Sequence, residues 1–156
     1  MGDVAGTSPS IISLVCSVPA RMRTPIAELH DGSMPLRVLL VDDDARFRSV
    51  ACRTLVEEGV EVVAEVGNAL DAAGEVARCR PDVVLLDIGL PDIDGPEVAR
   101  RLQKQDTGVV IILISTRDLA HGRRVARGLA AGYLPKDQLS LRAILEIVPP
   151  VSTQGP

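Results

Sequence analysis

A chain of 156 residues, 46% of them hydrophobic, is long enough for one domain with its own core, and its formal net charge of −4 argues against nucleic acid as the main partner. No apolar run approaches the roughly 18–20 residues of a membrane span, and no basic residue precedes the run 11–18 as it would in a signal peptide. We therefore expect a cytoplasmic protein that does not engage a membrane.

The sequence divides into three parts. Residues 1–34 mix Gly, Ser, Thr and Pro without a sustained period, which predicts a disordered N-terminal extension. Residues 35–148 carry a regular pattern and are expected to form the folded domain. Only the tail 149–156 follows, so we expect no attached DNA-binding domain.

From residue 35 onward, short apolar runs alternate with amphipathic segments. The runs predict strands at 36–41, 60–66, 82–86, 109–114 and 132–135. The intervening segments predict a first helix between Asp44 and Gly59, and further helices at 69–79, 97–105, 118–130 and 139–148. This alternation predicts an α/β fold: a doubly wound, five-stranded parallel sheet with helices on both faces. We adopt the flavodoxin-like strand order 2-1-3-4-5, which is common among such sheets.

Polar side chains follow four of these strands at the point where each strand ends. Asp42 and Asp43 follow the first strand, Asp87 the third, Ser115 the fourth and Lys136 the fifth. Parallel strands end at the same edge of a sheet, and ligands bind there in open α/β sheets. If strands one and three are neighbours, Asp43 and Asp87 face each other.

Crowded carboxylates predict a cation. Two of them a few Å apart repel by roughly 4 kcal/mol at an effective dielectric of about 20, and a bound cation relieves this. Oxygen ligands alone favour Mg²⁺, held by one or two carboxylates with water and substrate phosphate. An aspartate in such a site can attack phosphorus and become an aspartyl phosphate, with Ser115 and Lys136 contacting the phosphoryl oxygens.

Other polar residues have ordinary structural explanations. Asp44 is expected to cap the first helix. Asp92 and Asp94 stand beside Gly95 and are typical of a turn rather than of metal ligands. His121 has no cysteine or acid at metal-binding spacing and is expected at the surface.

Four segments carry a resemblance to a known family. VDDDARFR, VVLLDIGLPDIDG, VVIILIST and GYLPKD resemble the signatures of the response-regulator receiver family, the CheY-like proteins of two-component signalling. The resemblance extends from residue 36 to about residue 148. An apolar strand, then Asp, then L-P-D-x-D-G is its most specific part. It implies a phosphoacceptor switch rather than an enzyme in the usual sense.

The resemblance implies a role for each acidic residue. Asp87 resembles the phosphoacceptor. Asp43 resembles the direct Mg²⁺ ligand, with Asp42 beside it, and the backbone carbonyl of Gly89 resembles the third protein ligand.

The resemblance also implies a switch. Ser115 resembles the hydroxyl that moves to the phosphate, Tyr133 the aromatic residue that swings inward with it, and Lys136 the lysine that contacts the phosphate.

The implied partners are a histidine kinase or phosphotransfer protein and a downstream protein that binds the face formed by the fourth and fifth helices. Residues 117–148, which include this face, hold six basic and three acidic side chains, a net charge of +3. An acidic protein surface is therefore the expected target. One departure from the family pattern, GLAAG before Tyr133, leaves the end of the fourth helix uncertain.

Two alternatives remain open at this point. Haloacid-dehalogenase-type phosphatases also begin with an apolar strand and D-x-D, a spacing that Asp42 and Asp44 fit, although the acidic pair they need after the lysine is absent after Lys136. The other alternative is a degenerate receiver that binds partners without being phosphorylated.

Overall fold

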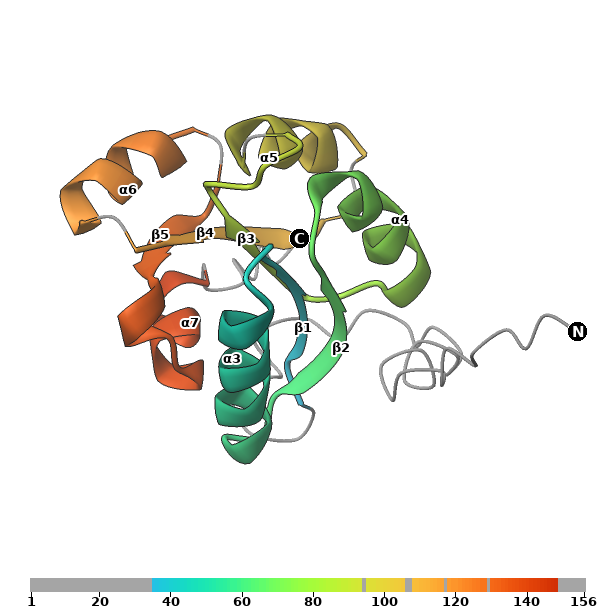
Figure 1. Ribbon diagram of the computed structural model, residues 1–156, viewed down its shortest axis with the longest axis vertical. Coiled ribbons are helices and arrows are strands. Elements are labelled where there is room, and N and C mark those ends of the chain that lie inside the picture. The colour runs from blue at the N-terminus through green and yellow to red at the C-terminus, as the bar shows by residue number, and fades with distance from the viewer. Residues whose placement is uncertain (1–34, 94, 106–107, 117, 129, 149–156) are drawn as a thin grey trace, which may run out of the picture.

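The computed structural model describes residues 35–93, 95–105, 108–116, 118–128 and 130–148 (Figure 1). The predicted extension 1–34 and tail 149–156 lie outside these described residues. The strands are β1 Arg37–Val41, β2 Glu61–Val66, β3 Val83–Asp87, β4 Val110–Ser115 and β5 Gly132–Pro135. The helices are α3 Ala45–Glu57, α4 Ala69–Cys79, α5 Gly95–Lys104, α6 Leu119–Ala126 and α7 Leu141–Ile147, with a 3₁₀ turn at Lys136–Gln138. Among the described residues, no helix combines the length and the apolar composition needed to cross a bilayer.

The strands form one parallel sheet in the order β2-β1-β3-β4-β5, as predicted. Helices α4, α5 and α6 cover one face of the sheet, and α3 and α7 cover the other (Figure 1). The central pairing of β1 with β3 places Val41 opposite Leu86. The residues that follow these two strands are therefore neighbours at the carboxyl edge of the sheet.

Alternating strand residues fill two apolar layers. Leu39 and Val41 of β1 contribute to the layer under α4, α5 and α6, whereas Val38 and Leu40 contribute to the layer under α3 and α7. All four are fully buried. Burying one such side chain stabilises a fold by roughly 1.5–3 kcal/mol, so aliphatic residues can hold the sheet with hardly any aromatic contribution.

The fourth helix of the predicted pattern is shorter than expected. Helix α6 ends at Ala126, Arg127 is its C-cap, and Gly128 adopts a φ of 75°. Glycine reaches positive φ without a steric penalty and is common just beyond a helix end. The prediction of a helix that continues to residue 130 was wrong, because an interior helix position cannot hold this backbone conformation. The other predicted boundaries lie within two residues of those observed.

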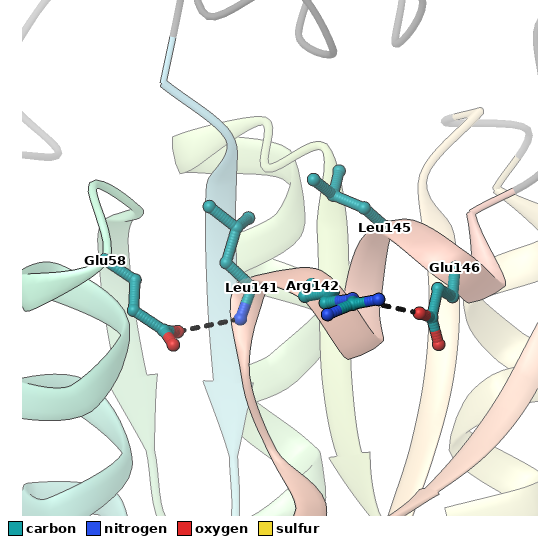
Figure 2. Close-up of a pocket in the computed structure, with 5 residues that line it drawn as sticks. All are labelled: Glu58, Leu141, Arg142, Leu145 and Glu146. Carbon is teal, nitrogen blue, oxygen red and sulfur yellow. Dashed lines mark hydrogen bonds and ion pairs between the residues drawn. The ribbon is translucent and has the colours of Figure 1, made fainter.

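Helices α3 and α7 are joined at one end. Glu58, the C-cap of α3, accepts a hydrogen bond from the backbone N–H of Leu141 at 2.8 Å, which satisfies one free donor at the start of α7 (Figure 2). Leu141 and Leu145 line an open groove there with Arg142 and Glu146, which form an ion pair at 3.4 Å. None of the polar residues expected at the carboxyl edge of the sheet lines this groove.

Candidate functional site

The fold gathers the predicted acidic residues at one place. Asp42, Asp43 and Asp87 each offer a carboxylate oxygen, and these oxygens lie within 4.8 Å of one another. Asp42 and Asp87 are buried and Asp43 is exposed. Together with Lys136, which contacts two of them, they are called the acidic edge below. The sequence-based prediction that Asp43 and Asp87 lie together is confirmed.

Asp42 is the most deeply buried member of the acidic edge, with no exposed surface. Its Oδ1 accepts the backbone N–H of Asp44 at 2.8 Å. The Nζ atom of Lys136 lies 2.6 Å from its Oδ2. That contact is an ion pair, and no other described residue forms a hydrogen bond with the same Oδ2. A buried carboxylate oxygen with spare acceptor capacity is what a metal site provides.

Asp87 is held by the loop that follows it. The backbone N–H of Gly89 donates to its Oδ1 at 3.2 Å, and Lys136 Nζ lies 3.6 Å from its Oδ2. Burial raises the pKa of Asp87 above its usual value, and the negative charges of Asp42 and Asp43 act in the same direction. The Gly89 N–H and the Lys136 charge oppose that rise. A nearby cation therefore favours the ionised, nucleophilic form of this carboxylate.

Lys136 supplies the positive charge of the acidic edge. It begins the 3₁₀ turn directly after β5. Burial alone would lower its pKa, but the contact with Asp42 and the charge of Asp87 raise the pKa above its usual value, so the ammonium stays charged. Its Nζ lies 4.6 Å from the centroid of the Phe47 ring of α3, within the range of a cation–π contact. The amphipathic pattern that predicted this helix gave no sign of the contact.

The donor set of the acidic edge fits Mg²⁺. Three carboxylates face one lysine among the described residues, which leaves an excess of negative charge. The available ligands are all oxygen atoms, which suit a hard cation, and Asp42 Oδ2 has the Lys136 ion pair but no other partner among the described residues. Gly89 lies beside Asp87, to which its backbone N–H donates.

Ser115 and Tyr133 form a second group next to the acidic edge. Ser115 ends β4, the strand beside β3, and is buried. The Tyr133 hydroxyl donates to the backbone carbonyl of Ser115 at 3.3 Å. Its ring is buried, with 4% of its surface exposed, and burial raises the pKa of the hydroxyl.

The Tyr133 ring occupies a space that a glycine provides. A Cβ atom on Gly122 of α6 would lie 2.1 Å from two carbon atoms of the ring. Glycine is therefore the residue that lets the ring pack against this helix. We call Gly122 and the ring above it the tyrosine seat. Sequence patterns did not reveal this contact, because glycine in a helix usually signals only a weak helix.

Comparison with known proteins settles the family. Residues 38–148 match the family model of the response regulator receiver domain. The chain belongs to this family. The membership confirms the resemblance to the CheY-like proteins of two-component signalling. It also leaves the phosphatase alternative unsupported, since the carboxylate of Asp44 caps α3 by accepting the N–H groups of Arg46 and Phe47.

Curated relatives of this receiver are longer proteins. Over 108 residues it is 42% identical to response regulator MprA of Mycobacterium sp. (strain KMS), covering 66% of this chain and 45% of that protein. Over 125 residues it is 34% identical to the protein-glutamate methylesterase/protein-glutamine glutaminase of Nitrobacter hamburgensis, covering 75% of this chain and 33% of that protein. The receiver thus spans between about a third and a half of the length of these relatives.

Solved structures resemble the receiver over most of their length. The signal receiver domain of the putative response regulator NarL from Mycobacterium tuberculosis matches with a TM-score of 0.65 and 32% identity, covering 72% of this chain and 94% of that one. Chemotaxis protein CheY4 of Vibrio cholerae matches with a TM-score of 0.65 at 22% identity, covering 74% of this chain and all of that one, and supports the fold alone.

Proposed function

We propose that the chain is a phosphoacceptor switch: Asp87 accepts a phosphoryl group from a histidine kinase or phosphotransfer protein in a Mg²⁺-dependent step. The observation that carries the proposal is the acidic edge itself. Three carboxylates whose oxygens lie within 4.8 Å of one another and one charged lysine meet at the carboxyl ends of β1, β3 and β5. This arrangement supplies the nucleophile, the metal ligands and the neutralising charge that phosphoryl transfer needs.

The chemical step assigns the attack to Asp87. One of its carboxylate oxygens forms a bond to phosphorus while the bond from phosphorus to the donor breaks, and the donor leaves with that electron pair. Asp42, Asp43 and the backbone carbonyl of Gly89 would join Asp87 in holding Mg²⁺, and the bound ion would neutralise charge on the phosphoryl oxygens. Lys136, 3.6 Å from Asp87, contributes a fixed positive charge to the same oxygens.

The output of the switch involves Ser115 and Tyr133. Ser115 supplies a hydroxyl to the phosphoryl group, and a change at Ser115 reaches Tyr133 through the hydrogen bond between them. The face next to Tyr133 carries the basic residues Arg123 and Arg127, which line a groove between α6 and α7 with the tyrosine. We propose that an acidic protein surface binds this face of a cytoplasmic switch.

The partner proposal has its own test. Reversing the charge of Arg123, Arg124 and Arg127 together should abolish salt-sensitive binding to a protein recovered with the phosphorylated chain. Equal recovery with the reversed face, or recovery of nucleic acid alone, would refute an acidic protein target. A degenerate receiver would bind the same partner without any phosphodonor.

Labelling with a small phosphodonor tests the proposed function. Incubation with the donor and Mg²⁺ should give a phosphoryl adduct by intact mass that hydroxylamine removes, as expected for an acyl phosphate. The adduct should be absent when Mg²⁺ is chelated. Binding of Mg²⁺ without any adduct would favour the degenerate receiver instead.

A further inference from the structure

Asp92 makes contacts that a turn residue does not need. It lies in the loop between β3 and α5 and had been expected only to shape that turn. Its Oδ1 accepts the backbone N–H of Ala69 at 3.0 Å, and its Oδ2 accepts those of Ala69 and Leu70 at 3.0 and 3.1 Å. These are the first two residues of α4, more than twenty positions earlier in the chain. The same hydrogen bonds lower the pKa of Asp92, so its carboxylate is ionised at neutral pH.

The start of α4 already has a local cap. Asn68 is the N-cap, and its side-chain oxygen accepts the N–H of Asp71 at 3.0 Å. Asp92 accepts two further N–H groups, those of Ala69 and Leu70, from a separate segment of the chain. The start of α4 is therefore capped twice, by Asn68 within its own segment and by Asp92 from the loop between β3 and α5.

The loop that contains Asp92 also contains Gly89. It is attached to the rest of the fold at Ile88, whose N–H donates to the Ile114 carbonyl at 3.1 Å, and at Leu90, which is buried in the core. Pro91 separates Leu90 from Asp92, and its ring fixes its own φ and restricts the residue before it. The segment between Gly89 and Asp92 is therefore short and restricted in its backbone angles.

The start of α4 is itself connected to the opposite side of the acidic edge. Helix α4 follows β2, whose last residue, Val66, pairs with Val41 at the end of β1. The N–H of Asp42 donates to the carbonyl of Val66 at 3.0 Å. A closed chain of contacts therefore runs from Asp42 through β2 and α4 to Asp92, and from there through the loop to Gly89 and Asp87.

We propose that Asp92 is a positioning residue for the metal site, because its carboxylate ties the loop that carries Gly89 to α4 and thereby fixes the backbone oxygen of Gly89 relative to Asp42 and Asp43. The inference rests on the proposed function, since it assumes that the acidic edge binds Mg²⁺. Residues that orient metal ligands from outside the ligand shell typically change metal affinity by about 10–100-fold when they are removed.

Two substitutions of Asp92 separate its hydrogen bonds from its charge. Asp92→Ala and Asp92→Asn both remove the negative charge, but the asparagine keeps one acceptor oxygen. Titration of Mg²⁺, followed by thermal stabilisation or by the fluorescence of Tyr133, the one tyrosine of a chain without tryptophan, should show affinity about 10-fold weaker in Asp92→Ala. Asp92→Asn should recover most of that loss.

Two control variants act on the same helix end without touching the loop. Asn68→Ala removes the local cap, and Asp71→Asn removes a negative charge from the first turn of α4. Both should keep Mg²⁺ affinity within about twofold of the unaltered protein, although Asn68→Ala lowers stability as loss of a cap does. Rates of phosphoryl labelling at saturating Mg²⁺ should be similar in all variants, because the nucleophile is unchanged.

The outcomes separate this inference from the proposed function. If the unaltered protein binds Mg²⁺ and Asp92→Ala binds it equally well, Asp92 is only a helix cap and the inference is wrong. Equal weakening by Asn68→Ala would contradict it too, since helix stability would then be the cause. If Asp92→Ala does not fold, Asp92→Ser decides, because its single hydroxyl oxygen cannot replace the two carboxylate oxygens that hold Ala69 and Leu70. Affinity weaker than both controls supports positioning, and affinity equal to the unaltered protein opposes it. Absence of Mg²⁺ binding in the unaltered protein would instead overturn the proposed function.

Discussion

The acidic edge lies at the ends of β1, β3 and β5, whereas the tyrosine seat lies between β5 and α6, and the two regions are held by different forces. The acidic edge consists of buried charges: Asp42 has no exposed surface, and Lys136 contacts both it and Asp87. The tyrosine seat depends on shape, because the Tyr133 ring fills space that exists only while residue 122 lacks a side chain. Substitutions that change charge should therefore affect the first region, and substitutions that change volume should affect the second.

Metal binding gives the largest expected effect on stability, and it belongs to the acidic edge. Mg²⁺ at about 100 times its dissociation constant should add roughly 2.7 kcal/mol to the free energy of unfolding by mass action. Asp43→Ala should remove most of this increment, because Asp43 is proposed as a direct Mg²⁺ ligand and its carboxylate is the exposed one of the three. Urea unfolding with and without Mg²⁺ measures it, and Gly122→Ala should keep the full increment. An unchanged Mg²⁺ response in Asp43→Ala would place the metal elsewhere.

A volume change should disturb the tyrosine seat alone. Gly122→Ala puts a Cβ atom against the Tyr133 ring, and overpacking of this kind typically costs about 1–3 kcal/mol. The ring must move or the helix must shift, so the fluorescence of Tyr133 should change as well. Gly74→Ala in α4 is the matched control, because a Cβ atom there meets nothing within 4 Å. It should stabilise the protein by roughly 0.5–1 kcal/mol, as alanine does relative to glycine within a helix. Equal effects of the two substitutions would show that the seat is not tightly packed.

The pH dependence of stability should sharpen the comparison by a smaller amount. The pKa of Asp87 is raised in the folded state from its ordinary value of 3.8. The stability that the protonated carboxyl contributes to the fold is therefore fully present below pH 3.8 and is lost as the pH rises through the raised pKa. Asp87→Asn cannot ionise at this position. In Mg²⁺-free buffer, its stability relative to the unaltered protein should therefore increase from about pH 3 to about pH 7. If the difference in stability between Asp87→Asn and the unaltered protein stayed constant across this range, the surroundings would not be raising the pKa of Asp87.

These two regions also differ in how far the sequence could predict them. The acidic edge can be predicted from the positions at which the strands end. Once the strand after residue 36 and the strand before Asp87 are recognised as parallel neighbours, Asp43 and Asp87 must lie close together. That inference needs only local patterns and the strand order, and the structure confirms it. It does not need the packing of any individual helix.

The tyrosine seat and the contacts of Asp92 needed information that local patterns lack. Gly122 matters because of a ring that lies eleven positions later in the chain, and Asp92 matters because of a helix end more than twenty positions earlier. The end of α6 was also missed, since the φ of Gly128 depends on how the chain returns to β5. Contacts between segments that only tertiary packing brings together cannot be derived from the periodicity of either segment.

The most direct test of the central claim compares Asp87→Asn with Asp44→Asn under a small phosphodonor and Mg²⁺. Asp44 follows the same strand as the acidic edge and caps α3, a role that asparagine also fulfils, so its variant should fold and take up the phosphoryl group fully. Asp87→Asn should fold and show no adduct by intact mass, because the attacking oxygen has been replaced. Full labelling of Asp87→Asn, or loss of labelling in Asp44→Asn alone, would contradict the assignment of Asp87 as the phosphoacceptor.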